Sequence, residues 1–235
     1  MCMACAAMSR RRFLGVGAGG LAAAGLVSAG LITPAFAKTS LTPDEALAKL
    51  KAGNEKFVSA PELCEIDMQA NRAEVAQGQS PWATVLTCAD SRVSPELLFG
   101  GMNLGELFVC RNAGNMADTA TMGSIEYAVE HLRTPLILVL GHERCGAVSA
   151  ACEAAEKGTK FPGSIGPMVD AILPAAQSLL GKPGDFVDNV AIESARLTAA
   201  KITESEIVAE LIHEGKLKVV YGRYDLDAGQ VDFIG

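Results

Sequence analysis

Residues 136–142 read Leu-Ile-Leu-Val-Leu-Gly-His, an apolar run that ends in a histidine. Such a run is typical of a strand that is buried on both faces, in the middle of a parallel sheet. Residues 83–88 read Ala-Thr-Val-Leu-Thr-Cys and predict a second buried strand, which ends in a cysteine. Binding crevices in α/β sheets open beyond the carboxyl ends of the strands. The sequence therefore predicts that Cys88 and His142 lie at the functional edge of a sheet.

Strand-like and helix-like segments alternate around these two runs. We expect helices at 43–59, 66–78, 116–133 and 146–157 and within 165–180 and 186–214, and further strands at 107–111, 217–222 and 230–234. This alternation predicts an α/β fold with a mostly parallel central sheet flanked by helices. The last two strands flank the turn Asp227-Ala228-Gly229, which predicts an antiparallel edge strand.

The first 37 residues differ in character from the rest of the chain. Ser9-Arg10-Arg11 is followed by Phe13-Leu14 and a Gly/Ala-rich apolar stretch, and Ala35-Phe36-Ala37 fits a small-x-small cleavage pattern. The segment resembles a twin-arginine export signal, whose passengers fold before they cross the membrane. We expect a cleaved signal peptide over 1–37, one α/β domain over 38–235, and a periplasmic or exported location. The apolar stretch is also long enough to span a bilayer, so an uncleaved anchor is the alternative.

The charge balance is acidic. The chain has 20 Lys and Arg against 27 Asp and Glu, and removal of the three arginines of the signal leaves 17 against 27, a net charge near −10. This balance argues against a nucleic-acid partner. No segment after residue 38 approaches membrane-spanning length, so we expect no stable membrane association after signal cleavage.

Cys88, His142 and Cys145 together form a ligand set for zinc. Two sulfurs and one nitrogen supply three of the four positions of a tetrahedral Zn²⁺ ion. Structural zinc sites usually have four Cys or His ligands in closely spaced pairs, and a fourth is missing here. The pattern therefore favours an open coordination position over a purely structural zinc site.

The paired motifs Cys88-x-Asp90-x-Arg92 and His142-x-x-Cys145 resemble those of the β-class carbonic anhydrases. The resemblance covers about residues 42–235 and includes the segments Gly105-Glu106, Arg111-Asn-Ala-Gly-Asn115, Ile125-Glu126-Tyr127 and Tyr224-Asp225-Leu226. It implies the fold of that family and one zinc ion per subunit, held by Cys88, His142 and Cys145. It also implies carbonate dehydratase activity, a zinc lyase reaction in which zinc-bound hydroxide reversibly hydrates CO₂ to bicarbonate and a proton.

The same resemblance assigns Asp90 and Arg92 as the catalytic pair, and physical chemistry supports these roles. Two thiolates offset the charge of Zn²⁺, so a hydrogen-bond acceptor beside the metal-bound water becomes useful. Asp90 is placed for this role but could instead become the fourth ligand. A bidentate clamp from Arg92 would keep Asp90 deprotonated and away from the metal.

Further site residues follow from the resemblance. It implies that Gln79, nine positions before Cys88, orients the substrate, and backbone near Gly146 is expected to approach the site. Relatives that are shut by bicarbonate carry a tryptophan where this chain has Val85, alongside an arginine and a tyrosine that Arg111 and Tyr224 could match. Without the tryptophan we expect an open, water-bound zinc near neutral pH.

The resemblance also implies a homodimer or dimer-based oligomer in which the helix at 43–59 lies on the partner. Two alternatives to CO₂ hydration remain open. One is hydrolysis of a CO₂ analogue such as carbonyl sulfide or carbon disulfide, and the other is a non-catalytic zinc- or bicarbonate-binding protein closed by Asp90. Cys110 and Cys152 are expected to be core residues, whereas Cys64 is an exposed thiol or a disulfide partner and stays unassigned.

Overall fold

The structure is a computed structural model that describes residues 39–64 and 72–235. The expected signal peptide at 1–37 lies outside these ranges and stays a prediction. Within them, no helix is both long enough and apolar enough to cross a membrane.

A five-stranded sheet with the order β2-β1-β3-β4-β5 forms the centre of the fold. The strands are β1 (Ala83–Cys88), β2 (Leu107–Asn112), β3 (Leu136–His142), β4 (Lys218–Tyr224) and β5 (Val231–Ile234). The first four strands are parallel, and β5 pairs antiparallel with β4 at one edge. The predicted fold class is therefore confirmed.

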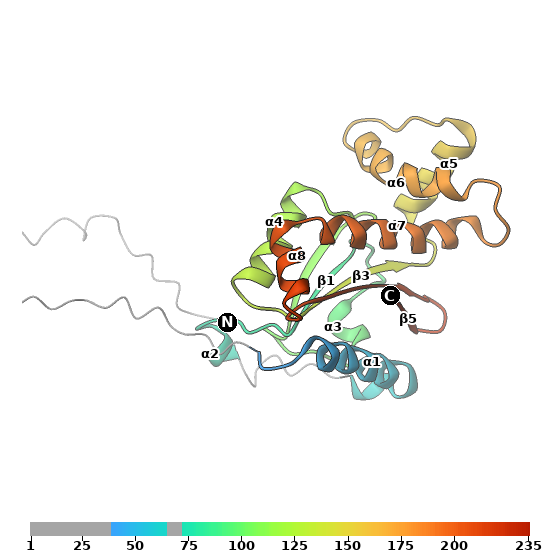
Figure 1. Cartoon of the computed structure of the whole chain (residues 1–235). Coiled ribbons are helices and arrows are strands. Elements are labelled where there is room, and N and C mark those ends of the chain that lie inside the picture. The colour runs from blue at the N-terminus through green and yellow to red at the C-terminus, as the bar shows by residue number, and fades with distance from the viewer. Residues whose placement is uncertain (1–38, 65–71) are drawn as a thin grey trace, which may run out of the picture. The chain divides into compact units, whose positions relative to one another are not determined.

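Helices cover both faces of the sheet (Figure 1). The covering helices are α1 (Pro43–Ser59) and α3 (Pro95–Leu98) on one face and α4 (Thr119–Glu130), α7 (Phe186–Thr203) and α8 (Glu206–His213) on the other. All seven residues of β3 are buried, and they alternate between the two layers. Leu138 packs in the cluster with α1, whereas Ile137 and Val139 pack in the cluster with α4 and α7. This two-sided burial explains why the sequence of β3 is continuously apolar.

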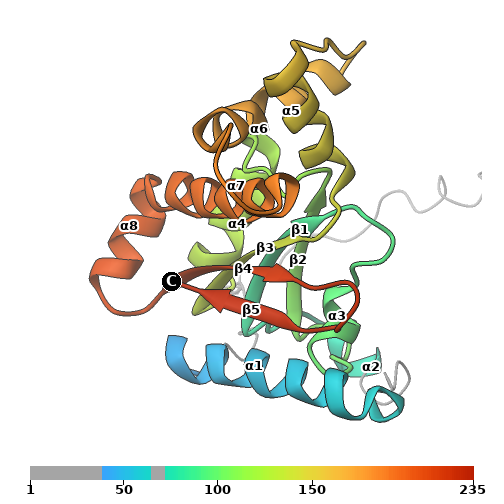
Figure 2. The same ribbon diagram turned by 90° about the vertical axis from the view of Figure 1, so that its right-hand side faces the viewer.

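A third cluster lies beyond β3, where α5 (Gly146–Lys157) and α6 (Ile165–Leu179) stand side by side (Figure 2). These helices pack with the first turns of α7 in a cluster that also contains Cys88 and Cys145. The α5–α6 pair therefore encloses one side of the edge at which β1 and β3 end.

Helix α1 begins and ends at the predicted residues, and a cap at its N-terminus fixes its start. The Glu45 backbone N–H donates to the Thr42 hydroxyl, and the Thr42 N–H donates to the Glu45 carboxylate. This reciprocal capping box satisfies two backbone donors at the helix start.

The middle of α1 is fixed to the rest of the domain by two adjacent residues. Asn54 is buried, donates to the Gly229 carbonyl at 3.0 Å, and accepts from the Val231 N–H at 2.8 Å. Gly53 lies against the backbone of Phe99, so that a Cβ atom at Gly53 would lie 2.0 Å from the Phe99 carbonyl oxygen. The helix is therefore attached to both α3 and the β4–β5 turn.

The predicted helix at 116–133 is shorter at both ends, because α4 begins at Thr119 and ends at Glu130. The Asn112 side chain accepts from the Met116 N–H and donates to the Met116 carbonyl, each at 2.7 Å. These bonds hold the preceding residues in a turn, and Asp118 then caps the helix by accepting from the Thr121 N–H.

The other differences concern short elements and helix breaks. The helical content predicted within 186–214 is confirmed as two helices, α7 and α8, and the helix predicted at 66–78 is described only as α2 (Arg72–Val75). The 3-10 helix η2 (Pro61–Leu63) and α3 were not predicted. Cys64, which the sequence left unassigned, follows η2 as a buried free thiol.

Candidate metal centre

Two cysteines and one histidine meet at the carboxyl ends of β1 and β3. Cys88 is the last residue of β1, His142 is the last residue of β3, and Cys145 immediately precedes α5. All three side chains are buried, and their ligand atoms lie within 4.8 Å of one another. The structure thus brings together the three residues that the sequence pairs as metal ligands.

The geometry of this group fits a tetrahedral zinc ion. The sulfurs of Cys88 and Cys145 are 3.9 Å apart, and two zinc thiolate bonds of about 2.3 Å at a tetrahedral angle require about 3.8 Å. His142 Nδ1 lies 2.8 Å from the Glu143 carbonyl oxygen, and His142 Nε2 is buried without a hydrogen-bond partner. A proton on Nδ1 leaves the lone pair of Nε2 available for a metal. Among the described residues, no fourth Cys, His, Asp or Glu joins this ligand group.

The two thiols share a hydrogen bond. A hydrogen bond from Cys145, assisted by His142 and the Gly114 N–H, outweighs burial and lowers the pKa of Cys88 to about 4. The same bond to Cys88 and the burial of its own sulfur raise the pKa of Cys145 well above its usual range. Both sulfurs must be deprotonated to act as metal ligands, so metal binding releases any proton that they share.

Asp90 is held beside the ligand group by Arg92. Arg92 Nε donates to Asp90 Oδ1 at 2.9 Å, and Arg92 Nη2 donates to Asp90 Oδ2 at 2.7 Å. The bonds from Arg92 keep the pKa of Asp90 well below its usual range, so this carboxyl is ionised at neutral pH. Asp90 Oδ2 lies 4.0 Å from His142 Nε2. An ionised acceptor thus faces the ligand group, and the clamp expected from the sequence is present.

The backbone that carries Cys88 and Asp90 is fixed from β2. Arg111 Nε donates to the Cys88 carbonyl at 3.0 Å, and Arg111 Nη2 donates to the Asp90 carbonyl at 2.6 Å. The Gly114 N–H donates to the Cys88 sulfur at 3.5 Å. From the sequence, Arg111 was considered only as a match to an arginine of relatives that are shut by bicarbonate. Its contacts with the Cys88 and Asp90 carbonyls were not predicted, because no local sequence pattern indicates them.

The remaining predicted site residues lie at different distances from the ligands. Gly146 follows Cys145 in the chain but is exposed, and a Cβ atom there would point into open space at the surface. Gln79 is exposed and precedes β1, at the opposite end of that strand from Cys88. Val85 and Tyr224 are both buried in the apolar cluster with α1. The structure therefore does not bring Gln79 to the ligand group of its own chain.

Comparison with known proteins adds information about ancestry. A sequence model of the family described as carbonic anhydrase matches residues 83–231. Carbonic anhydrase 2 of Mycobacterium tuberculosis is 40% identical over 199 residues, which cover 82% of this chain and 95% of that protein.

Solved structures give the same picture. A β-carbonic anhydrase of Coccomyxa, solved in complex with acetazolamide, is 29% identical with a TM-score of 0.61 and covers 83% of this chain and 86% of that chain. A structure from a report on two tetrameric β-carbonic anhydrases of the ascomycete Sordaria macrospora has a TM-score of 0.63 at 23% identity, covering 77% of this chain and 90% of that chain. The second likeness concerns the fold alone.

Proposed function

The chain belongs to the carbonic anhydrase family and has the fold of its β class, and we propose on that premise that it reversibly hydrates CO₂ to bicarbonate and a proton. The observation that carries the proposal is the buried group of Cys88, His142 and Cys145 beside the clamped Asp90. This group offers three metal ligands and, next to them, an ionised acceptor. A purely structural metal site has no use for such an acceptor.

We propose that Cys88 Sγ, Cys145 Sγ and His142 Nε2 hold one zinc ion per chain. When bound, zinc supplies a Lewis acid that lowers the pKa of water far below its bulk value. The buried thiolate of Cys88, the hydrogen-bonded His142 ring and the N-terminal end of α5 create the pocket for this ion.

Asp90 and Arg92 then act on the reacting water. Because the pKa of Asp90 is well below its usual range, the carboxylate accepts a hydrogen bond and orients the water without itself supplying a proton. Arg92 occupies both carboxylate oxygens, which keeps Asp90 from taking a position as a metal ligand.

We further propose a dimer-based assembly, to which the tetramers reported from Sordaria macrospora lend support. Trp82 already pairs with the neighbouring strand, and about 20 Å of extended chain separates Trp82 from Cys88. Gln79, which lies before Trp82, can therefore serve as a substrate-orienting residue only at the metal centre of a second copy. Chains carrying Gln79→Ala and chains carrying Cys88→Ala, co-expressed, should then form mixed dimers that are more active than either variant alone. Activity no higher than the mean of the two separate variants would rule out this placement of Gln79.

We also propose that the chain is exported, because its first 37 residues have the twin-arginine pattern described above. The proposal requires that zinc be acquired before transport, since passengers of that route are already folded.

The function is tested by stopped-flow CO₂ hydration with zinc-loaded protein at pH 8. Turnover should be fast, should be inhibited by acetazolamide, and should fall by at least 100-fold in Asp90→Asn with zinc content retained. Undetectable turnover with one zinc ion per chain would overturn the proposal. If kcat/KM were higher for carbonyl sulfide than for CO₂, carbonyl sulfide would become the proposed substrate and the proposed metal centre would be unchanged.

A further inference from the structure

Glu143, which follows His142, uses all of its polar groups in hydrogen bonds. Its carbonyl oxygen lies 2.8 Å from His142 Nδ1, its N–H donates to the Tyr224 carbonyl at 3.0 Å, and its carboxylate accepts from the Leu226 N–H at 3.1 Å. The contact at Nδ1 sets the tautomer and the orientation of the His142 ring. The position of Glu143 therefore decides where His142 Nε2 points.

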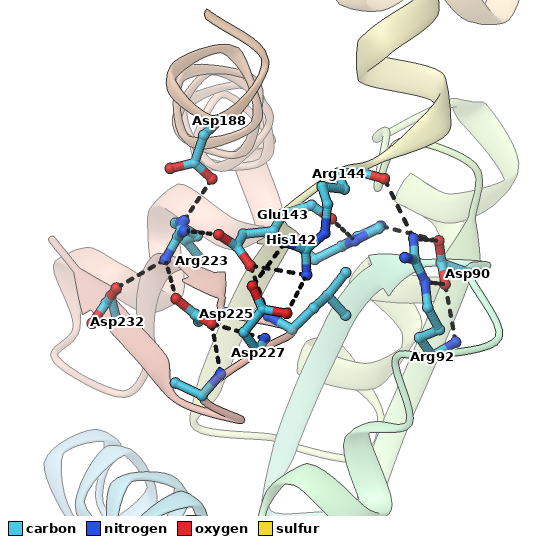
Figure 3. A network of polar contacts seen from close by, with 12 residues as sticks. Asp90, Arg92, His142, Glu143, Arg144, Asp188, Arg223, Asp225, Asp227 and Asp232 are labelled. Atoms are coloured by element: carbon cyan, nitrogen blue, oxygen red, sulfur yellow. Dashed lines mark hydrogen bonds and ion pairs between the residues drawn. The ribbon is translucent and has the colours of Figure 1, made fainter. Parts of the chain in front are cut away.

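Glu143 is in turn held by a largely buried arginine of β4 (Figure 3). Arg223 Nη2 lies 2.6 Å from Glu143 Oε1, and these side chains are 14% and 18% exposed. Arg223 also contacts Asp188 of α7 at 2.6 Å and Asp225 at 3.4 Å. Burial opposes the charge of Arg223, but these carboxylates outweigh burial and raise its pKa, so the guanidinium stays charged. The carboxylates of Glu143, Asp188 and Asp225 are therefore all paired with Arg223. Through this arginine, Glu143 is connected to β4 and to α7.

Arg144, the next residue, links the β4–β5 turn to the catalytic pair. Its Nη1 and Nη2 each donate to a different carboxylate oxygen of Asp227 at 2.9 Å. Its backbone has a φ of 49°, a left-handed conformation that is unfavourable for a residue with a side chain. Its carbonyl oxygen accepts from Arg92 Nη2 at 3.3 Å. The bidentate contact with Asp227 thus holds a strained residue whose carbonyl supports Arg92.

We propose that the β4–β5 hairpin is a positioning element of the metal centre, with two separable effects. Through Arg223 and Glu143 it orients the His142 ring, and through Asp227 and Arg144 it holds Arg92 on Asp90. The inference rests on the proposed function for the second effect only, because the first concerns metal binding. These four side chains are positioning residues, since none of them contributes an atom to the ligand group.

The first effect is tested by the zinc affinity of Glu143→Gln, measured by competition with a chromophoric chelator. The variant weakens the charge-assisted contact with Arg223, and the dissociation constant for zinc should rise about 10-fold, as is usual when the partner of a ligand is disturbed. The matched control is Glu193→Gln on α7, because Glu193 is also a partly exposed glutamate paired with an arginine, Arg196, and lies outside the ligand group. Equal zinc affinity of the wild type and Glu143→Gln, or equal weakening in the control, would overturn this half of the proposal.

The second effect is tested by Asp227→Asn, which changes an exposed residue and leaves the core intact. We expect kcat to fall about 2- to 5-fold, the size expected from an exposed ion pair, with unchanged zinc affinity. The visible spectrum of the cobalt-substituted protein should also shift, because Asp90 gains access to the metal. Asp227→Glu should restore both properties. The control is Asp44→Asn, which removes an exposed aspartate paired with Lys218.

If Asp227→Asn and Asp44→Asn had the same kcat and the same cobalt spectrum, the proposed role of the β4–β5 turn would be refuted. Failure of the proposed function has a different signature, since the wild type would then be inactive. The chelator and cobalt measurements would still report on positioning in that case.

Discussion

Arg92 reaches both oxygens of the Asp90 carboxylate, with its Nε on Oδ1 and its Nη2 on Oδ2. A lysine has a single ammonium group and cannot reproduce this planar, two-point contact. We expect Arg92→Lys to retain zinc but to lower kcat/KM for CO₂ by about 10- to 100-fold. Stopped-flow assays of this variant should be compared with Arg196→Lys, which breaks a similar bidentate contact on α7. Full activity of Arg92→Lys would show that the clamp is dispensable.

Gly53 is expected to tolerate no side chain. In Gly53→Ala the new Cβ would overlap the Phe99 carbonyl, and the backbone shift should lower the free energy of unfolding by about 2–4 kcal/mol. Gly123→Ala on α4 is the matched control, because a Cβ there meets no atom within 4 Å. This control should be more stable than the wild type by about 0.5–1 kcal/mol. Urea titrations measure both differences, and equal stability of the two variants would contradict the packing described for α1.

Glu106 should contribute stability that depends on pH. Burial raises the pKa of its carboxyl, but bonds from the Asn103 N–H at 2.7 Å, Lys49 at 3.0 Å and Trp82 Nε1 at 3.3 Å outweigh burial and lower it overall. A carboxyl whose pKa is lower in the folded state stabilises the fold above its unfolded pKa of 4.5 and loses that effect as the pH falls through the folded value.

The wild type should therefore be more stable than Glu106→Gln by about 1 kcal/mol of unfolding free energy at pH 7. This difference should shrink below pH 4.5. Denaturation at a series of pH values measures it. A difference that grows on acidification would reverse the sign argued here.

The export proposal predicts different results for adjacent arginines. Arg10→Lys combined with Arg11→Lys should retain the precursor in the cytoplasm, whereas Arg12→Lys, outside the paired positions of the pattern, should not. Cell fractionation and N-terminal sequencing of the exported product measure both outcomes. Normal export of the double variant would exclude the twin-arginine route.

The sequence predicted those parts of the fold whose signals are local. Helix α1 was predicted over its full length because Thr42, Pro43 and Glu45 cap it, and β3 because its burial on two faces leaves a continuous apolar run. The start of α4 was placed too early because the turn before it depends on the Asn112 side chain, which gives no periodic pattern.

The residues of the candidate site likewise divide into those with a local sequence signal and those without one. Cys88, His142 and Cys145 were recognisable because their residue types and strand-end positions are unusual together. The contacts of Glu143 and Arg144 were not predicted. Their partners Arg223 and Asp227 lie about 80 residues further along the chain, and only the pairing of β3 with β4 brings them close.

The pairing of β1 with β3, in which Thr87 lies opposite Leu140, has a thermodynamic consequence. Cys88 and His142 become neighbours only when these central strands are in register, so an unfolded chain has no comparable ion site. Free zinc at about 100 times its dissociation constant should then raise the free energy of unfolding by about 2.7 kcal/mol. The melting temperature should rise with the logarithm of zinc concentration. A zinc ion bound there would therefore stabilise the pairing of the two central strands, and zinc starvation would shorten the lifetime of the protein before it limited the rate of any reaction.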